Sequence, residues 1–160
     1  MPYTRMDSPI GELTLVASDA GLRAIWWPDD VRAVALEDRD DDHPVLAQTR
    51  AQLQEYFDAG RREFTVALDP AGTPFQHKAW EVLRGIEYGH TITYGEQARR
   101  LGDPRKARAV GAANGRNPIS IIVPCHRVVG ASGALTGFAG GMAAKQWLLD
   151  FEQGQGQAFM

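Results

Sequence analysis

The chain has 160 residues, of which 44% are hydrophobic and 23% are charged, a composition typical of a soluble globular protein with one core or two small lobes. No stretch reaches the roughly eighteen apolar residues of a membrane span, and the N-terminus shows no apolar segment typical of a signal peptide. One cysteine cannot form an internal disulfide, so we expect a protein of the reducing cytoplasm. These features exclude a membrane-embedded protein and a small disulfide-stabilised domain.

The net charge of -3 conceals a division of charge along the chain. Residues 1–72 hold 7 basic and 14 acidic side chains, whereas residues 73–160 hold 10 basic and 6 acidic ones. Between residues 97 and 127, seven basic residues stand against one acid, Asp103, a net charge of +6. A charge run is usually a solvated face, but segregation of this size also indicates a binding site for a polyanion such as nucleic acid.

The first lobe, residues 1–72, reads as strands and a helix. Its short segments rich in branched and aromatic residues are separated by turn signals, which predicts two hairpins. Apolar residues then recur at helical spacing over 45–57, and Gly60 ends the element. No catalytic constellation is present in this lobe. The predicted strands cover 3–7, 12–18, 22–27 and 64–68.

The second lobe, residues 73–160, is predicted to be mostly helical. Thr73 and Gln76 form a capping box with Pro74 at the first helical position, and Thr93 and Glu96 repeat the box. A tight turn at Leu101-Gly102 separates two of the helices, which predicts a helix-turn-helix; a helical hairpin used only for packing is the alternative. The predicted helices run from 74 to about 87, from 94 to 101, from 103 to about 114 and from 143 to 151.

The second helix of this pair has two unusual features. Small residues from Ala107 to Gly115 make it thin, and Arg105, Lys106 and Arg108 lie at its start. A helix N-terminus with free amide groups also favours phosphate. Duplex nucleic acid fits both features.

The only cysteine, Cys125, follows an apolar run that ends at Pro124. Taken alone, a cysteine after such a run is typical of an inert core residue. Here His126 and Arg127 follow it directly, and such neighbours stabilise a thiolate, the nucleophilic form. The four histidines are scattered and offer no zinc-ligand spacing with one thiol, so we predict a nucleophilic cysteine without a metal or cofactor.

Two features follow the cysteine. Residues 130–141 are rich in glycine but lack the spacing of a phosphate loop, which predicts a lid that approaches a ligand closely. The last predicted helix brings Glu152 back toward the body of this lobe, and residues from 153 onward are expected to be a disordered tail.

Several ordered motifs closely resemble the O6-alkylguanine-DNA alkyltransferases, also called methylated-DNA–protein-cysteine methyltransferases. The resemblance is specific over residues 73–152 and one of layout over the first lobe. It implies an α+β fold with a small N-terminal antiparallel sheet and helix and a mostly helical C-terminal domain. The motifs are Thr93-Tyr-Gly95, Arg108-Ala-Val-Gly111, Asn117-Pro118, Pro124-Cys-His-Arg-Val128 and Lys145-Gln-Trp-Leu-Leu149.

The resemblance also implies the reaction. Family members move an alkyl group irreversibly from O6-alkylguanine in DNA, with O4-alkylthymine a further candidate substrate, onto their own cysteine. It implies that a histidine takes the thiol proton through a water, that a glutamate orients this histidine, and that an arginine finger enters through the minor groove. The implied catalytic residues are Cys125, His126, Glu152 and Tyr94; the DNA contacts are Arg108, Tyr94, Thr93, Arg105, Lys106, Arg116 and the hinge residue Asn117; the base pocket is formed by Val128, Ala139, Cys125 and Lys145.

The implied partner is double-stranded DNA that carries alkylated guanine, bound by a monomer, with cooperative binding left open. One departure from the family is Phe138, which replaces a tyrosine common in the lid. A protein that binds the lesion without catalysis is an alternative, because degenerate relatives carry tryptophan in place of the cysteine. A cysteine hydrolase or acyltransferase built on Cys125 and His126 is another, although it leaves the basic helix unexplained.

Overall fold

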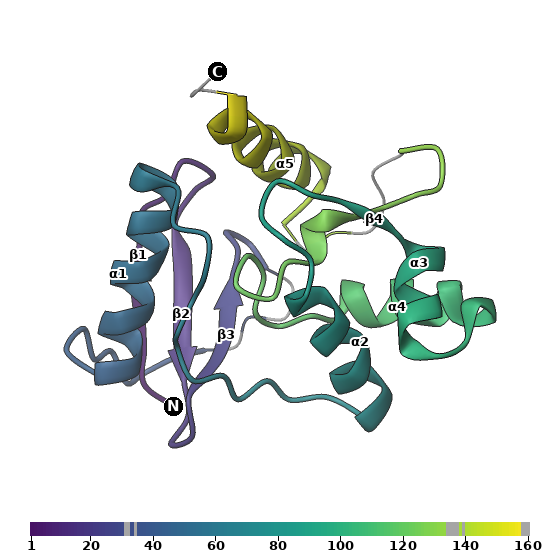
Figure 1. Ribbon diagram of the computed structural model, residues 1–160. Coiled ribbons are helices and arrows are strands. Elements are labelled where there is room, and N and C mark those ends of the chain that lie inside the picture. Colours follow the sequence, from purple (N-terminus) through teal and green to yellow (C-terminus); the bar gives the residue numbers. More distant parts are fainter. Residues whose placement is uncertain (31–32, 34, 134–137, 139, 158–160) are drawn as a thin grey trace. The chain divides into compact units, whose positions relative to one another are not determined.

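The computed structural model describes residues 1–160 except 31–32, 34, 134–137, 139 and 158–160, and describes 155–157 by their backbone alone. The chain divides into two compact units, Met1–Ala71 and Gly72–Met160 (Figure 1). Among the helices of the described residues, none has the length and apolar character to cross a membrane.

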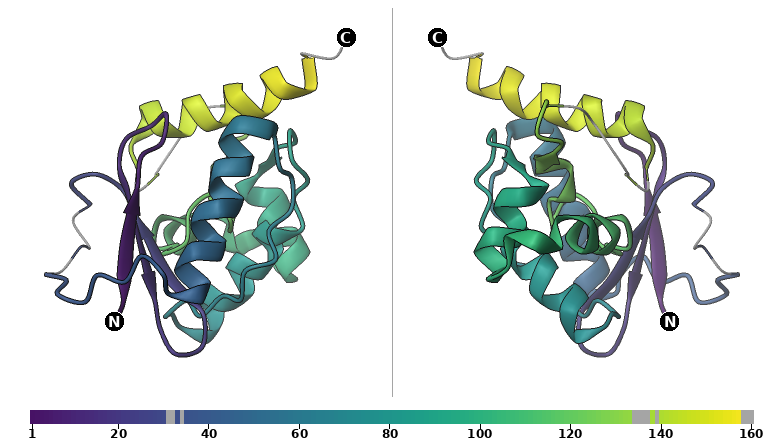
Figure 2. Two further views of the ribbon diagram at one scale, coloured as in Figure 1. Left: turned by 90° about the vertical axis from the view of Figure 1, so that its left-hand side faces the viewer. Right: turned by 90° about the vertical axis from the view of Figure 1, so that its right-hand side faces the viewer.

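The first unit is a three-stranded antiparallel sheet with one helix against a face (Figure 2). The hairpins pair Tyr3 with Val16 and Leu15 with Ile25, and a bulge follows Val16. Every second side chain of a strand points to the same face, so the alternation seen in the sequence places the leucines in the core. The elements are β1 (Tyr3–Met6), β2 (Leu13–Ala17), β3 (Leu22–Trp26) and α1 (Pro44–Ala59).

The helix α1 supplies the rest of this core. Leu46, Leu53 and Tyr56 are fully buried and recur at helical spacing, as predicted. Gly60 ends the helix in the left-handed conformation with φ of 69°, which a glycine adopts without steric cost. The predicted order of the first three strands and the helix that follows them is confirmed.

The predicted strand over 64–68 is wrong. This segment makes a single parallel bridge, between Leu68 and Leu22. The reason is a side chain: Gln52 of α1 accepts a hydrogen bond from the Thr65 amide at 2.9 Å and donates to its hydroxyl at 2.6 Å. Because the Thr65 amide is bonded to Gln52 of α1, it is not available for a hydrogen bond to a neighbouring strand. The segment therefore runs along the helix without regular secondary structure.

The second unit contains the remaining helices and a two-stranded parallel ladder. The first predicted capping box is present, since Thr73 accepts from the Gln76 amide and Gln76 accepts from the Thr73 amide. At the second, only the hydrogen bond from the Glu96 amide to Thr93 forms, because the Glu96 carboxylate pairs with arginines of α3 instead. The ladder pairs Ile92 with Val128, and so ties the start of α3 to the chain that leaves Cys125. The elements are α2 (Pro74–Arg84), β4 (Ile92–Thr93), α3 (Tyr94–Leu101), the 3-10 turn η1 (Pro104–Lys106), α4 (Ala107–Gly115), the 3-10 turn η2 (Cys125–Arg127), β5 (Val128–Val129) and α5 (Met142–Gln157).

The predicted helix-turn-helix forms with a correction at its second helix. As predicted, Asp103 caps this helix, and its side chain accepts from the Arg105 amide at 3.0 Å. The first turn, however, is the 3-10 turn η1, and the α-helix begins only at Ala107. The predicted ends of α2 and α5 also differ. Gly85 and Ile86 donate to carbonyls three residues back, so α2 closes at Arg84 rather than near 87.

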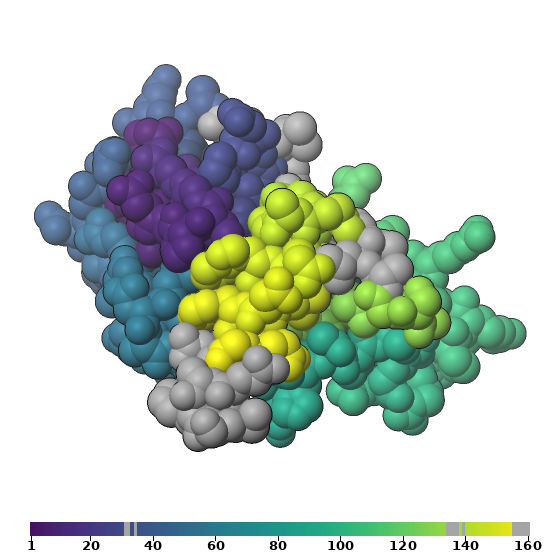
Figure 3. Space-filling view, turned by 90° about the horizontal axis from the view of Figure 1, so that it is seen from above, coloured from purple at the N-terminus to yellow at the C-terminus, as the bar shows by residue number. Residues whose placement is uncertain are grey.

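The disordered tail predicted from residue 153 is wrong for residues 153–157, because α5 continues to Gln157; residues 158–160 lie outside the described residues. Gln153 donates to the carbonyl of Gly89 at 2.6 Å, and Glu152 is fixed in a buried ion pair. These two contacts offset the cost of about 1 kcal/mol that Gly154 adds inside a helix. In Figure 3, α5 (yellow) lies at the surface of this unit.

A buried pair of amides links α3 to α4. Gln97 Nε2 donates to Asn114 Oδ1 at 2.9 Å and Asn114 Nδ2 donates to Gln97 Oε1 at 2.7 Å, while Gln97 also reaches the Ala79 carbonyl of α2. Around this pair lies a core of Ala98, Val110 and other small residues. No local pattern predicts the pair, because two ordinary polar residues seventeen apart carry no spacing signal.

Replacing Gln97 by alanine should lower the free energy of unfolding by about 1–3 kcal/mol, because Asn114 is left buried without its partner. Urea denaturation measures this loss. The matched control is Gln146→Ala, at an exposed glutamine of α5, which should change stability by less than about 0.5 kcal/mol. Equal effects of the two variants would show that the amide pair contributes nothing.

Candidate active site

The segment between α4 and Cys125 is a tight buried loop organised by Asn117. The Asn117 side chain donates to the Val123 carbonyl at 2.8 Å and accepts from the Ile119 amide at 3.0 Å. At its sharpest point Ile121 has φ of 75°, a left-handed conformation that costs a β-branched residue on the order of 1–3 kcal/mol. The strained backbone of this loop lowers the stability of the fold, and the same loop holds the backbone that leads into Cys125.

Cys125 begins η2 with 6% of its surface exposed. Burial raises the pKa of its thiol, since a thiolate loses solvation there. Three neighbours oppose this rise: hydrogen bonds from the side chains of Asn117 and Ser120, and the positive charge of Lys145. The resting group is therefore a thiol whose surroundings already favour the anion once the proton leaves.

His126 and Glu152 form a fully buried pair. His126 Nε2 donates to Glu152 Oε2 at 2.8 Å, which assigns the ring proton to Nε2 and leaves Nδ1 as an acceptor. No hydrogen-bond partner of His126 Nδ1 is found among the described residues. Burial lowers the pKa of His126, with Glu152 acting in the opposite direction. Nδ1 is therefore the ring nitrogen left to accept a proton, on the residue that follows Cys125 in the chain.

Arg127 lies behind this pair and is 5% exposed. Its Nε and Nη2 donate to the two oxygens of Glu152 at 2.9 and 3.0 Å, and its Nη1 donates to the Ile86 carbonyl at 2.7 Å. Burial alone would raise the pKa of Glu152, but the bonds from His126 and Arg127 outweigh it and hold the pKa well below its usual range. Glu152 is therefore a carboxylate throughout the physiological range.

Lys145 of α5 connects Cys125 to Tyr94. Its side chain is fully buried, and its Nζ lies 3.5 Å from the Tyr94 hydroxyl. Burial lowers the pKa of Lys145 and the nearby Cys125 raises it, so each group favours the charged form of the other. The Tyr94 ring also packs close to Gly111, where an ideal Cβ would lie 3.6 Å from it. Tyr94 thus lies between the thiol side of the site and α4.

The basic segment is less positive at its surface than its sequence suggests. Glu96 lies one residue before the counted segment and pairs with Arg99 and Arg100 at 2.6 and 3.2 Å. Arg105 pairs with Asp103 at 3.1 Å, and Arg127 is buried on Glu152. A count of charges along the chain misses these pairings.

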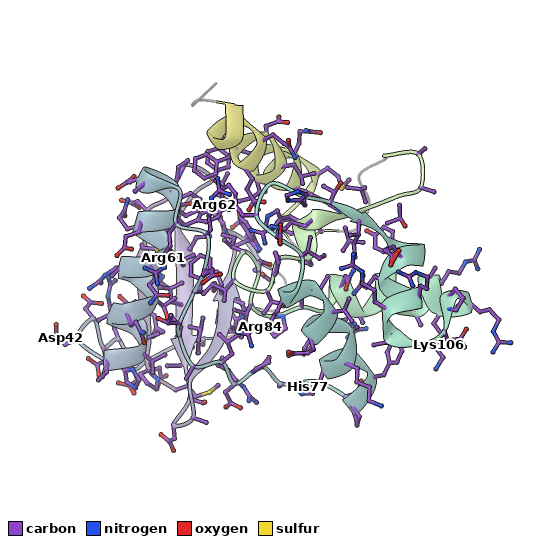
Figure 4. The ribbon with its side chains drawn as sticks, in the orientation of Figure 1. Asp42, Arg61, Arg62, His77, Arg84 and Lys106 are labelled. Atoms are coloured by element: carbon purple, nitrogen blue, oxygen red, sulfur yellow. The ribbon has the colours of Figure 1, made fainter. Side chains whose placement is uncertain are left out.

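Three of the predicted DNA contacts remain available. Lys106, Arg108 and Arg116 are exposed, and none has an acidic partner within the part of the chain that the structure describes. Figure 4 shows Lys106 at the outer end of the helix-turn-helix, where side chains project from the unit. Arg105, 88% exposed at its side chain, joins them because an ion pair so open to solvent is worth little against a phosphate.

The other predicted site residues have more internal positions. The Thr93 hydroxyl accepts from the Glu96 amide and so caps α3. Asn117 is 1% exposed and belongs to the loop, so its side chain is not open to a direct DNA contact. Val128 is buried in the β4–β5 ladder and its amide donates to the Cys125 carbonyl. Ala139 and residues 134–137 of the predicted lid lie outside the described residues.

Sequence reasoning missed Ser120 as a site residue, and it missed that Arg127 is buried in the site. Ser120 hydrogen-bonds to Cys125, and Arg127, counted among the basic residues of a DNA surface, is a buried partner of Glu152. The signal for Arg127 was its position in the sequence, directly after Cys125 and His126 at the end of an apolar run. Within the described residues, no group of three histidine, cysteine or acidic side chains is placed to hold a metal ion.

Two sequence families match the chain, one for each unit. Residues 74–154 match the family described as "6-O-methylguanine DNA methyltransferase, DNA binding domain". Residues 1–70 match the one described as "6-O-methylguanine DNA methyltransferase, ribonuclease-like domain". Together they cover nearly the whole chain.

Relatives and solved structures agree with the family matches. A protein of Methanosarcina acetivorans named methylated-DNA–protein-cysteine methyltransferase is 42% identical over 153 residues, 95% of this chain and 98% of the relative. A protein of the same name from Mycolicibacterium paratuberculosis is 45% identical over 94% of this chain and 92% of the relative. The crystal structure of Mycobacterium tuberculosis OGT in complex with DNA is similar with a TM-score of 0.88 and 45% identity, covering 97% of this chain and 94% of the other.

Proposed function

The chain belongs to the 6-O-methylguanine DNA methyltransferase family, and we infer that it repairs DNA by moving an alkyl group from guanine O6 onto its own Cys125. The transfer is irreversible, so one molecule repairs one lesion. The observation that carries this conclusion is that Cys125 and His126 are neighbours in η2 and that His126 is hydrogen-bonded to Glu152. The relatives of this chain are named methyltransferases. DNA is the partner, and the similar structure solved with DNA supports this.

The chemistry is a displacement at carbon. The Cys125 sulfur attacks the alkyl carbon, an S–C bond forms, and the bond between that carbon and guanine O6 breaks with its electrons passing to the base. A thiolate, a soft nucleophile, suits this step, but only a small fraction of a buried thiol is ionised to the thiolate. The thiol proton therefore moves to His126 Nδ1, by way of a water in our proposal. The departing guanine takes up one proton and the imidazolium gives one up, so the proton lost by the thiol is balanced by the proton on guanine and His126 ends neutral. The product is S-alkylcysteine and an ordinary guanine.

The surrounding side chains support that step in different ways. Glu152 fixes the proton on His126 Nε2 and stabilises the imidazolium as it forms. Lys145, Asn117 and Ser120 stabilise the thiolate. We propose that the Tyr94 hydroxyl, held beside Lys145, faces the extruded base, while the carbonyls of Cys125 and Val128 and the amide of Ala139 read its edge.

We propose that the lesion reaches Cys125 by base flipping through the minor groove. A base inside a duplex cannot be attacked by a buried sulfur, so it must rotate out at a cost of a few kcal/mol. The small residues of α4 leave a thin helix for a groove about 6 Å wide, and Arg108 at its first turn would fill the vacated space. We place Tyr94, Thr93, Arg105, Lys106 and Arg116 at the flanking phosphates, and the protein acting as a monomer in the cytoplasm.

Replacing Arg108 by alanine should slow repair of a methylated duplex at least tenfold while reaction with free O6-alkylguanine base changes little. The finger is needed only where a base must be held out of a stack. Rates on both substrates measure the difference. Arg84→Ala, at an exposed arginine of α2 (Figure 4), is the matched control and should affect neither reaction. Equal losses on duplex and free base would contradict the finger role.

The function itself is tested by counting transferred methyl groups. Excess duplex DNA with labelled O6-methylguanine should transfer at most one methyl group to each protein molecule. Binding without transfer would instead indicate a lesion-binding protein. Continued release of a small product over many turnovers would indicate a hydrolase, and either result would overturn the proposed function.

A further inference from the structure

Arg127 occupies a position that the transfer step does not explain. It is a buried arginine whose guanidinium makes two hydrogen bonds to Glu152 and one to the Ile86 carbonyl, and lies 5.6 Å from the centre of the Tyr88 ring. A paired, parallel contact between guanidinium and carboxylate is the strongest ion-pair geometry in proteins. Burying an arginine is costly, so its presence here indicates a function beyond support.

The charges that face His126 come from two elements. Glu152 and Lys145 lie on α5, and Cys125 and Arg127 flank the histidine on η2. Of these, Glu152 stabilises an imidazolium, whereas Arg127 and Lys145 destabilise one. A carboxylate with no other charged partner would raise the pKa of the buried histidine bonded to it and so favour uptake of a proton from solvent. A protonated His126 has no lone pair with which to accept the proton of Cys125.

We propose that Arg127 is a positioning residue that neutralises Glu152 and thereby keeps His126 uncharged in the resting protein. This inference rests on the proposed function and extends it. With Arg127 in place, Glu152 still fixes the His126 tautomer, but its charge is shared, so Nδ1 stays free to act as a base. Cys125 therefore rests as a thiol, and its proton moves to His126 only during transfer. The shift in the His126 pKa agrees with this role, because burial lowers the pKa most and the charge of Arg127 lowers it further.

The consequence is chemical protection of a protein that reacts once. A preformed thiolate and imidazolium pair would react with any small electrophile that reached the sulfur. Without Arg127, that pair would form at rest, since His126 would hold a proton and its charge would lower the pKa of Cys125. Arg127 thus favours selectivity for the lesion over general reactivity.

The state of His126 in the wild-type protein gives the first test. Nitrogen-15 NMR of histidine-labelled protein at pH 7 should show His126 neutral and protonated on Nε2, with the signal assigned by its loss in His126→Gln. An imidazolium in the wild-type protein would overturn the proposal by itself.

Two variants of Arg127 separate charge from geometry. Arg127→Met should give an imidazolium at His126, and the pH midpoint for alkylation of Cys125 by iodoacetamide without DNA should fall by at least one unit, about a tenfold change in thiolate population. Arg127→Lys keeps the charge but loses the paired contact, so its midpoint should stay near the wild-type value while methyl transfer slows. Arg84→Met is the control at an exposed arginine.

The outcomes are distinct. A purely structural role would loosen the site and raise the iodoacetamide rate at every pH without moving the midpoint, which would overturn the proposal. Arg127→Gln repeats the test should the methionine variant not fold. The NMR and iodoacetamide measurements use no DNA, so an unfavourable result in them leaves the transfer reaction intact, whereas absence of methyl transfer in the wild-type protein would overturn the proposed function alone.

Discussion

Replacing Cys125 by alanine is expected to reduce methyl transfer below detection while affinity for methylated duplex DNA stays close to that of the wild-type protein. The substitution removes the only sulfur that can accept the methyl group, since the chain has one cysteine and methionine is a far weaker nucleophile. It leaves the exposed basic residues of η1 and α4 unchanged. Transfer of labelled methyl and a binding titration measure the two properties.

The matched variant is Cys125→Ser, which keeps a hydrogen-bonding group among Asn117, Ser120 and Lys145 but offers a hard oxygen. It should be equally inactive and should bind DNA equally well. Methyl transfer by either variant would mean that another residue is the acceptor. Loss of DNA binding together with transfer would mean that the loop of residues 117–124 had collapsed.

Replacing Glu152 by alanine should have the largest effect on stability. Arg127 would keep its charge in a buried position with no carboxylate, and breaking a buried ion pair in this way costs about 3–5 kcal/mol. Methyl transfer should fall by about 10²–10⁴-fold, the usual contribution of a positioned general base. Denaturation and single-turnover rates measure these losses, and Glu81→Ala, at an exposed glutamate of α2, should change neither.

The pH dependence of stability gives an independent check on Glu152. Its pKa in the folded protein lies well below that of an unfolded glutamate, about 4.3, so the unfolded state binds the proton first as the pH falls. The stabilisation is fully present above about pH 5 and is lost progressively below it. The wild-type protein should therefore lose more stability than Glu152→Ala between about pH 5 and pH 3. Parallel curves for the two proteins would contradict a charged Glu152.

Much of the fold follows from short-range patterns. Alternation of apolar residues locates β1, β2 and β3, and the capping residues Thr73 and Thr93 mark where α2 and α3 begin. These signals act over three or four residues, so they are visible in the sequence. The failures lie at longer range: Gln52 takes the Thr65 amide that a strand would need, and Gln153 anchors to Gly89 sixty-four residues away.

The site divides in the same way. Cys125 and His126 are neighbours in the chain, so their chemistry is visible directly, whereas the pairing of His126 with Glu152 came from the family resemblance and is present in the structure. The fate of Arg127 depends on a carboxylate twenty-five residues away that no local pattern reports. A charge count treats all arginines as exposed, and only packing separates Arg108 from Arg127.

The central claim is that Cys125 is the methyl acceptor and is activated by its buried neighbours. Its most direct test is peptide mapping by mass spectrometry after one reaction with a methylated duplex. We predict S-methylcysteine at position 125, in nearly every molecule and at no other residue. A methyl group on a different side chain, or an unmodified Cys125 in a protein whose DNA has lost its lesion, would contradict the account.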